Sequence, residues 1–274
     1  MPYGLTLPYR LFLLHKLLKT NVMKAKKIFA LLLVGTMVFS CAKEEDIPVP
    51  VEEPASSPGG STGGGNTTGN AQPSFAGADA SLWAVKSLSV TTVAGQTITT
   101  TIGTGVATFI DGSSNFIGAG TVKLNTNTLT QNPNNSYVFT AGISMPTGID
   151  FSGGVAWDVA GGNGYSAFTK NVTLGFPTVS AVTSSGTITK ANGYTVSVNT
   201  VTGADSVLFL VGGVNKTIAG NANSCFFSSS ELSSLSNGTT VVQVAAYTST
   251  NETVGGKVIY YGNETVQTKT TTVE

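Results

Sequence analysis

The feature that most constrains this chain is the pattern of residues from Phe75 onward. Short runs rich in Val, Thr, Ile, Tyr and Phe are broken at close intervals by Gly, Asn and Asp. Apolar and polar residues alternate in residues 155–159, 194–198 and 242–246. A period of two places successive side chains on opposite faces of a strand, so the pattern predicts an all-β protein.

Two segments predict particular strands. Residues 205–211 are apolar on both faces, which predicts a central strand covered on both sides. The sequence Asn132-Pro133-Asn134-Asn135 is rich in turn-forming residues. It predicts a hairpin that joins residues 121–130 to residues 136–140.

Helix-forming patterns are nearly absent from this region. The one candidate is residues 228–238, where Ser228 and Glu231 have the spacing of a capping box. Gly238 follows at the position where a helix would end.

The β-rich region is long enough for one large sandwich or two smaller ones. Pro177 interrupts strand pairing. We therefore predict an N-terminal β-sandwich over residues 75–176 and a C-terminal one over residues 177–274, with a single larger sandwich as the alternative.

The strand order of the C-terminal part resembles a fibronectin type III domain. The resemblance lies in a strand with Tyr194 and Val196, then residues 207–211, then Cys225-Phe226-Phe227, then residues 242–246. It implies an Ig-like antiparallel sandwich. The sequence departs from the family at the corner tyrosine, where Val242 stands.

The N-terminal part has the composition of a secretory signal. A basic stretch at residues 23–27 precedes an apolar run at residues 28–39, which is short of the roughly 20 residues that span a bilayer. We predict a signal peptide over residues 23–40, with Met23 as the true start and residues 1–22 as an over-extended N-terminus.

Cys41 closes this segment. The sequence Val38-Phe39-Ser40-Cys41 resembles the lipobox of bacterial lipoproteins, and the resemblance implies acylation of Cys41, for example by palmitate. The alternative is an ordinary cysteine behind an ordinary signal peptide.

Lys43 and the acids at 44–46 follow Cys41. They resemble the export signal of surface-exposed Bacteroidetes-type lipoproteins, which implies a lipid-anchored position at the outer membrane and cell surface. A solvated charge run is the alternative. The Pro, Gly, Ser and Thr of the following residues give no apolar periodicity, so residues 41–74 are predicted to be an acylated N-terminus and a flexible tether.

Composition excludes several functions. All 14 acidic residues follow Cys41, whereas Arg10 and several lysines precede it, so the exported chain lacks the basic surface that nucleic acid requires. The sequence has one histidine, His15, which rules out Ser-His-Asp catalysis and histidine-ligated zinc in the exported chain. We therefore predict neither a metal site nor a cofactor.

A pair of carboxylates is the remaining catalytic option. Asp150 and Asp158 are close in sequence, but on one straight strand they would stand about 26 Å apart. Glycoside hydrolysis requires a separation of roughly 5–10 Å. We predict that the protein is not an enzyme, with a carboxylate-dependent hydrolase as the least favoured alternative.

Three further motifs have weak functional interpretations. Residues 111–115 (DGSSN) form either a calcium-binding loop or, as we expect, a plain Asp-Gly turn. Ser206 lies in an Asp-Ser-apolar triplet that resembles the O-glycosylation acceptor of Bacteroidetes-type secreted proteins. Cys225 lies in an apolar strand and is expected to be a small buried residue.

Aromatic residues are the candidates for ligand binding, because they stack on sugars and anchor protein interfaces. We select Trp83, Tyr165, Tyr260 and Tyr261. Trp157 is assigned to the core, since it stands at an inward position of an alternating strand.

Taken together, the sequence resembles uncharacterised surface lipoproteins of the Bacteroidetes type. The expected function is non-catalytic binding or presentation of a ligand at the outer membrane. A carbohydrate ligand predicts a solvent-facing aromatic pair, whereas a structural or adhesive module with a surface protein as partner predicts polar loop tips.

Overall fold

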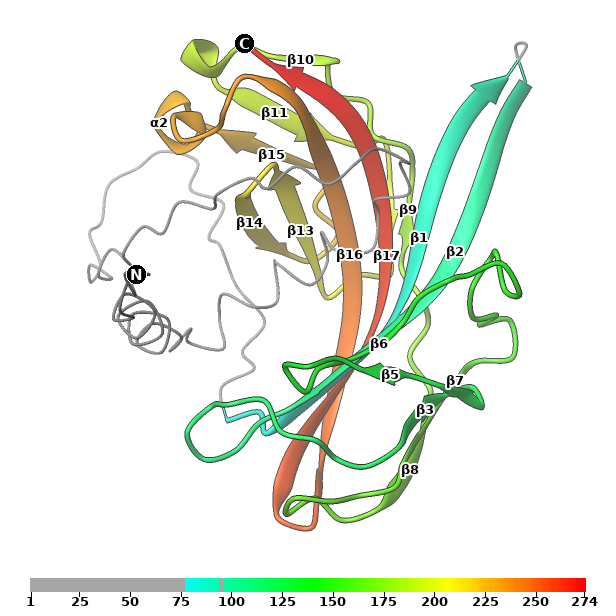
Figure 1. The fold of residues 1–274 in the computed structure, drawn as a ribbon. Helices are drawn as coiled ribbons and strands as arrows, with labels where there is room; N and C mark the ends of the chain where they lie inside the picture. Colours follow the sequence, from blue (N-terminus) through cyan, green and yellow to red (C-terminus); the bar gives the residue numbers. More distant parts are fainter. Residues whose placement is uncertain (1–76, 94–95) are drawn as a thin grey trace, which may run out of the picture. The chain divides into compact units, whose positions relative to one another are not determined.

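Two long hairpins dominate the computed structural model, which describes residues 77–93 and 96–274. The strands are β1 (Ala80–Val93) with β2 (Gln96–Phe109), and β16 (Gly238–Val254) with β17 (Lys257–Val273). Their content of Val and Thr favours strands. The hairpins join because β1 runs parallel to β17, from the pair Ala80–Ile259 to the pair Leu88–Gln267 (Figure 1).

These hairpins form the centre of a nine-stranded sheet. Its order is β14-β13-β16-β17-β1-β2-β6-β5, with β10 beside β17. The added strands are β5 (Thr130–Gln131), β6 (Tyr137–Phe139), β10 (Thr187–Ile188), β13 (Ser206–Val211) and β14 (Val214–Ala219). We call this element the central sheet.

A small second sheet covers one half of the central sheet. It consists of β11 (Tyr194–Ser197) and β15 (Ser224–Phe227), while β9 (Thr178–Val179) pairs with β12 (Val201–Thr202). One pair of strands facing the group β14-β13-β16-β17 is the layout of an Ig-like sandwich. Val207, Phe209, Val244 and Phe227 are fully buried between the layers, in what we call the C-terminal core.

A four-stranded sheet covers the other half. Its order is β4-β3-β7-β8, with the strands β3 (Val122–Leu124), β4 (Asn127–Thr128), β7 (Val155–Val159) and β8 (Phe168–Val172). Trp157, Leu124, Phe109 and Tyr261 are buried there, in what we call the N-terminal core.

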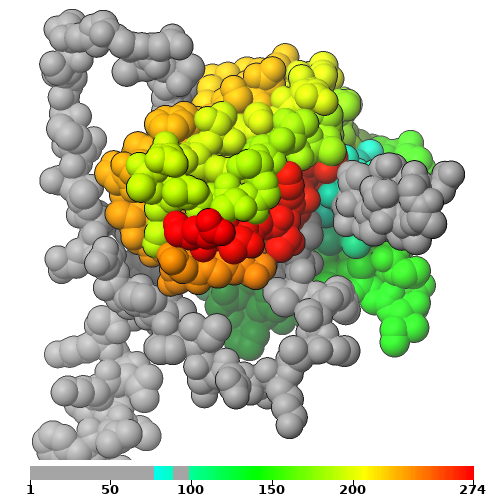
Figure 2. All heavy atoms as spheres, turned by 90° about the horizontal axis from the view of Figure 1, so that it is seen from above, coloured from blue at the N-terminus to red at the C-terminus, as the bar shows by residue number. Residues whose placement is uncertain are grey.

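The C-terminal end of β17 pairs in parallel with the short strand β10. Thr187 pairs with Thr272, and the amide of Glu274 donates to the carbonyl of Ile188 at 2.9 Å. Figure 2 shows this end of the chain between the segment that follows residue 177 and the start of β16. The parallel β10 therefore extends the central sheet beyond β17.

The sequence predicted the fold class correctly, since the described residues form an almost entirely β structure. Residues 155–159 alternate between buried and exposed as expected. The hairpin across Asn132–Asn135 is confirmed by the pairing of β5 with β6. The run 121–130 is instead broken after β3, because Asn125 and Thr126 adopt left-handed backbone conformations.

The helix is shorter than expected. α2 (Ser229–Leu232) is a single turn with the predicted capping box at Ser228 and Glu231, and a 3-10 turn, η2 (Lys190–Asn192), also occurs. Gly238 begins β16 rather than ending the helix. The serines after Leu232 compete for backbone groups, as Ser233 does by donating to the Ser230 carbonyl at 2.7 Å.

The boundary near residue 177 stays a prediction. The described residues lie in one compact unit, and β16 and β17 contribute to both cores. The predicted start, signal peptide, tether and lipidated Cys41 lie outside the described residues. Within residues 77–93 and 96–274, no helix is long and apolar enough to cross a membrane.

Candidate functional site

The aromatic residues selected from the sequence are mostly buried. The exposed fractions of Trp83, Tyr165 and Tyr261 are 3%, 5% and 0%, and Tyr260 is half-buried. Tyr260 and Tyr261 point to opposite faces of β17, and Tyr261 faces the N-terminal core. Ligand binding by these four residues stays a prediction, but three of them present no face to solvent in this structure.

Tyr165 shows why a loop position did not mean exposure. Its hydroxyl donates to the carbonyl of Asp79 at 2.5 Å and accepts from the amide of Ile110 at 3.2 Å. Its ring packs edge-on against Phe109. Burial raises the pKa of Tyr165 to about 12. Tyr165 therefore anchors its loop to the N-terminal core. The glycine-rich sequence around it indicated a loop but not this burial.

Ser206 and Cys225 are also buried. Ser206 is 5% exposed on β13, where it is the register partner of Tyr247 on β16. Glycosylation of Ser206 stays a prediction, and it would have to act on the unfolded chain. Cys225 is 6% exposed and burial raises its pKa, so it has the environment of a small core residue as expected.

The two carboxylates considered for hydrolysis have separate partners. Asp158 lies 3.3 Å from Lys123 Nζ on the exposed face of β7. Asp150 accepts from the hydroxyl and amide of Ser152, and these bonds lower the pKa of Asp150. The lowered pKa of Asp150 is the opposite of the raised pKa that a general acid requires.

Residues 111–115 form the expected turn. Asp111 accepts from the amides of Ser113 and Asn115 at 2.8 and 2.9 Å and from the Asn115 side chain at 3.0 Å. Among the described residues, no group of three or more His, Cys, Asp or Glu side chains could hold a metal ion.

The best candidate for a binding site is an exposed aromatic residue on β15. Phe226 is 56% exposed, whereas its neighbours Cys225 and Phe227 point into the C-terminal core. Its ring lies over Gly193, where an added Cβ would come within 2.5 Å of the ring. Glycine at this position therefore lets the ring lie flat on the surface.

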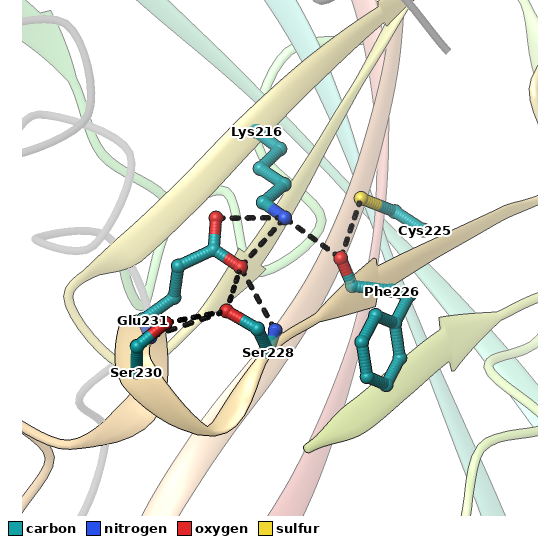
Figure 3. A network of polar contacts seen from close by, with 6 residues as sticks. All are labelled: Lys216, Cys225, Phe226, Ser228, Ser230 and Glu231. Atoms are coloured by element: carbon teal, nitrogen blue, oxygen red, sulfur yellow. Dashed lines mark hydrogen bonds and ion pairs between the residues drawn. The ribbon is translucent and has the colours of Figure 1, made fainter. Parts of the chain in front are cut away.

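A polar network fixes the backbone beside Phe226 (Figure 3). Lys216 Nζ on β14 donates to the Phe226 carbonyl at 2.8 Å and contacts both carboxylate oxygens of Glu231, at 2.7 and 2.8 Å. The amide and hydroxyl of Ser228 donate to the same carboxylate at 2.8 and 2.7 Å. We call Gly193, Lys216, Phe226, Ser228 and Glu231 the Phe226 patch.

The network holds Glu231 as a carboxylate. Burial opposes its ionisation, but the bonds from Lys216 and Ser228 outweigh burial and lower the pKa of Glu231. Glu231 separates the Ser228 hydroxyl from Lys216, so the serine has no free base to activate it. The patch is suited to recognition rather than to covalent chemistry.

The patch was missed in the sequence although a local signal was available. Alternation along Ser224-Cys225-Phe226-Phe227 places Cys225 and Phe227 on one face and Phe226 on the other. A large apolar side chain on the outer face of a strand, such as Phe226, is a candidate binding residue. A second exposed apolar residue, Ile143, occupies the tight turn between Gly142 and Met145.

Comparisons with known proteins give little help. No protein-family model and no curated protein matches the chain. A solved structure is described as "Structural insight into host cell surface retention of a 1.5-MDa bacterial ice-binding adhesin"; it is 21% identical, with 63% of this chain and 57% of that chain covered, at a TM-score of 0.23. The chain thus spans little more than half of that protein chain, and a similarity of this size carries no argument about function.

Proposed function

We propose that this chain is a non-catalytic lipoprotein, anchored through Cys41 at the outer membrane, that binds a protein partner at the cell surface. The observation that supports it is the Phe226 patch. A rigidly held, exposed aromatic ring beside an ion pair and hydroxyl groups is a typical anchor of protein interfaces.

A carbohydrate ligand is the second candidate. That function calls for a platform of two solvent-facing aromatic rings. Phe226 is the one aromatic residue among the exposed large hydrophobic side chains of the described chain, and Trp83, Tyr165 and Tyr261 are buried. A single ring beside Lys216 and Glu231 favours a protein partner over a sugar.

The charged groups also favour binding over hydrolysis. Each ion pair of the described residues joins an acid to a lysine, as Asp79 to Lys257 at 3.0 Å and Glu252 to Lys170 at 2.5 Å. Both acids have a lowered pKa, because bonds from these lysines and neighbouring groups outweigh burial. Acids held in this way serve the fold.

The proposal is tested with liposomes that carry the acylated full chain. The liposomes are applied to surfaces coated with host or bacterial surface proteins and, in parallel, to a panel of polysaccharides with and without Ca²⁺. We expect retention on protein and a severalfold loss with Phe226→Ser. Ile143→Ser, which removes an exposed apolar side chain elsewhere, is the matched control and should retain binding.

Other outcomes identify what is wrong. Retention by a polysaccharide that survives Phe226→Ser would contradict both the partner class and the patch. A Cys41→Ser chain that still enters the membrane fraction would contradict the anchor, independently of any ligand.

A further inference from the structure

The central sheet ends on one side at β14, which has a partner strand along one of its two edges (Figure 1). β13 and β14 form a hairpin across a two-residue loop that the pair Val211–Val214 closes. The φ of Gly212, 56°, fits the tight turn of such a loop. Among the described strands, β13 is the one that pairs with β14, so the second edge of β14 is an open edge of the sheet.

Hydrogen-bond alternation identifies the residues whose backbone groups face this open edge. In an antiparallel pair, every second residue bonds to the partner strand, and the residues between them point away from it. The closing pair of a two-residue hairpin is hydrogen-bonded, and beyond the other end of β14 the amide of Gly220 donates to the Asp205 carbonyl at 2.8 Å. The even positions of β14 therefore bond to β13. Asn215, Thr217 and Ala219 direct their N–H and C=O groups to the open edge.

These three edge residues have no backbone partner among the described residues. No hydrogen bond from a described residue reaches their N–H or C=O groups. Asn215 and Ala219 are exposed, whereas the Thr217 side chain, opposite Leu208 in the register, is 5% exposed. Free donors and acceptors along the last strand of a sheet are a template for a further strand.

β14 lacks the features that usually protect an open edge, which are proline, a bulge or a projecting charge. The strand contains no proline, and its register with β13 is unbroken. Its one charged residue, Lys216, lies on the same face as Ile218 of the C-terminal core. Lys216 is bound to Glu231 and to the Phe226 carbonyl (Figure 3). The lysine thus caps a backbone group of β15, while the edge of its own strand stays open.

The opposite end of the central sheet is better protected. The terminal strand there, β5, has two residues. Pro133 follows it closely, and the side chain of Gln131 is bound to Asn135 at 2.9 Å. A very short strand next to a proline is a poor template for a further strand. Of the two ends of the central sheet, β14 is therefore the one suited to pairing.

We propose that β14 pairs antiparallel with β14 of a second copy of this chain, so that two central sheets join into one across a twofold axis at Thr217. The axis places Asn215 opposite Ala219 of the second copy and Thr217 opposite its own equivalent. Each of these pairs exchanges two hydrogen bonds, so all the open N–H and C=O groups gain partners. An isologous contact of this kind is complete with two copies.

The side chains of β14 also favour a second copy. The register sets Thr217 against Thr217 of the second copy, which is a favourable cross-strand pair. Lys216 would lie opposite Ile218 and not opposite another lysine, and its charge is already balanced by Glu231. The edge therefore needs no acidic partner strand, and it is complementary to itself in both hydrogen bonding and charge.

Sedimentation velocity of the full chain in a density-matched detergent, over a wide range of concentrations, tests the proposal. We expect a monomer–dimer equilibrium. Thr217→Pro removes an N–H that β13 does not use, so the fold should be retained, and the dimer dissociation constant should rise about tenfold or more. Gln131→Pro is the matched control at the other end of the sheet and should leave the dissociation constant unchanged. Its amide also points away from its partner strand, because the next residue, Asn132, bonds to Ser136.

Hydrogen exchange on the unaltered chain gives a second readout that does not depend on a variant. The amides of residues 215, 217 and 219 should exchange about tenfold more slowly above the dissociation constant than well below it. Slow exchange at every concentration would show that another part of the chain pairs with the edge, and would overturn the proposal.

Two further results would contradict it. One is a chain that stays monomeric at all concentrations, and the other is a dimer that Thr217→Pro leaves equally strong. Phe226→Ser lies on β15 and should leave the dimer unchanged. Loss of partner binding and loss of dimerisation are therefore distinguishable.

Discussion

The N-terminal and C-terminal cores lie on the same face of the central sheet but use different side chains. The N-terminal core contains large aromatic residues, among them Phe109, Tyr137, Trp157 and Tyr165, whereas valine is the commonest residue of the C-terminal core. The four strands that cover the N-terminal core are short and are joined by long glycine-rich loops. The strands around the C-terminal core follow the regular order of an Ig-like sandwich.

Tyrosine hydroxyls account for this difference. Tyr137 accepts from the amide of Ala119 at 2.9 Å, and Tyr165 bonds to Asp79 and Ile110. Loops that enter a core carry backbone groups without strand partners, and a buried hydroxyl satisfies them at little loss of apolar area. In the C-terminal core one tyrosine acts in this way: Tyr194 donates to the Ser185 carbonyl at 2.6 Å, while Gln267 and Thr271 donate to the carbonyls of Val179 and Gly186.

The largest effect is expected for Phe209→Ala, which tests whether the two cores unfold together. Phe209 is fully buried in the C-terminal core, so we expect a loss of about 3–5 kcal/mol in the free energy of unfolding. Both tryptophans lie outside that core. Because β16 and β17 run through both cores, the tryptophan midpoint in urea should fall together with the far-UV circular dichroism. A tryptophan transition that stays at the wild-type midpoint would show that the cores unfold independently.

The second prediction concerns Glu264 on β17, a buried residue whose Oε2 atom has no hydrogen-bond partner among the described residues. The folded pKa of Glu264 is about 8 against an ordinary value of 4.5. The folded state therefore binds one more proton than the unfolded state between these values, and stability falls as pH rises through this window, by up to about 1.4 kcal/mol per pH unit. Glu264→Gln should remove that slope and be more stable than wild type by roughly 2–4 kcal/mol at pH 8.

Urea titrations at several pH values between 4 and 9 test this, with the difference between the two chains isolating Glu264. Equal slopes for both chains would mean that Glu264 is ionised in the folded state. The comparison also controls for the acids with a lowered pKa, such as Glu231 and Glu252, which both chains share.

The third prediction compares the two tyrosine networks. Tyr165→Phe removes the hydrogen bonds that the Tyr165 hydroxyl donates to the carbonyls of Asp79 and Ile110, so we expect a loss of about 2 kcal/mol in the free energy of unfolding. Tyr194→Phe removes one bond to a surface loop and should cost about 1 kcal/mol or less. Thermal unfolding of both variants gives the ranking, and an equal loss would remove the distinction between the cores.

The smallest effect is expected at the Phe226 patch. Lys216→Met removes the ion pair with Glu231 and the bond to the Phe226 carbonyl, and should lower stability by about 1 kcal/mol. Lys123→Met, in the more exposed pair with Asp158, is the matched control and should cost at most about 0.5 kcal/mol. If only Lys216→Met also weakens partner binding, the network positions Phe226.

Local elements were predictable because their signals lie within a few residues. Alternation identified β7 and β11, Asn132–Asn135 identified the β5–β6 turn, and Ser228 with Glu231 identified the helix start. The inward position of Trp157 follows from the same period of two. Each of these depends on neighbours in the chain and not on what packs above them.

The candidate site was less predictable. The four aromatic residues were chosen for their type and loop or strand position, yet Tyr165 and Tyr261 are bound to backbone and carboxylate groups inside the protein. The exposure of Phe226 was predictable from alternation. The glycine under its ring, Gly193, comes from the segment before β11, and Lys216, which donates to its carbonyl, comes from β14. Those contacts have no local signature.

The sequence by itself determined that this chain is built of β-strands, where several of its turns fall, and which side chains of a strand share a face. These follow from residue propensity and a period of two, which act over short distances. Only the tertiary structure decided that β1 joins β17 in parallel, that β16 and β17 serve both cores, and that a second face of the central sheet is buried. Strand partners such as Ala80 and Ile259 lie far apart in the chain, and burial depends on which surfaces meet.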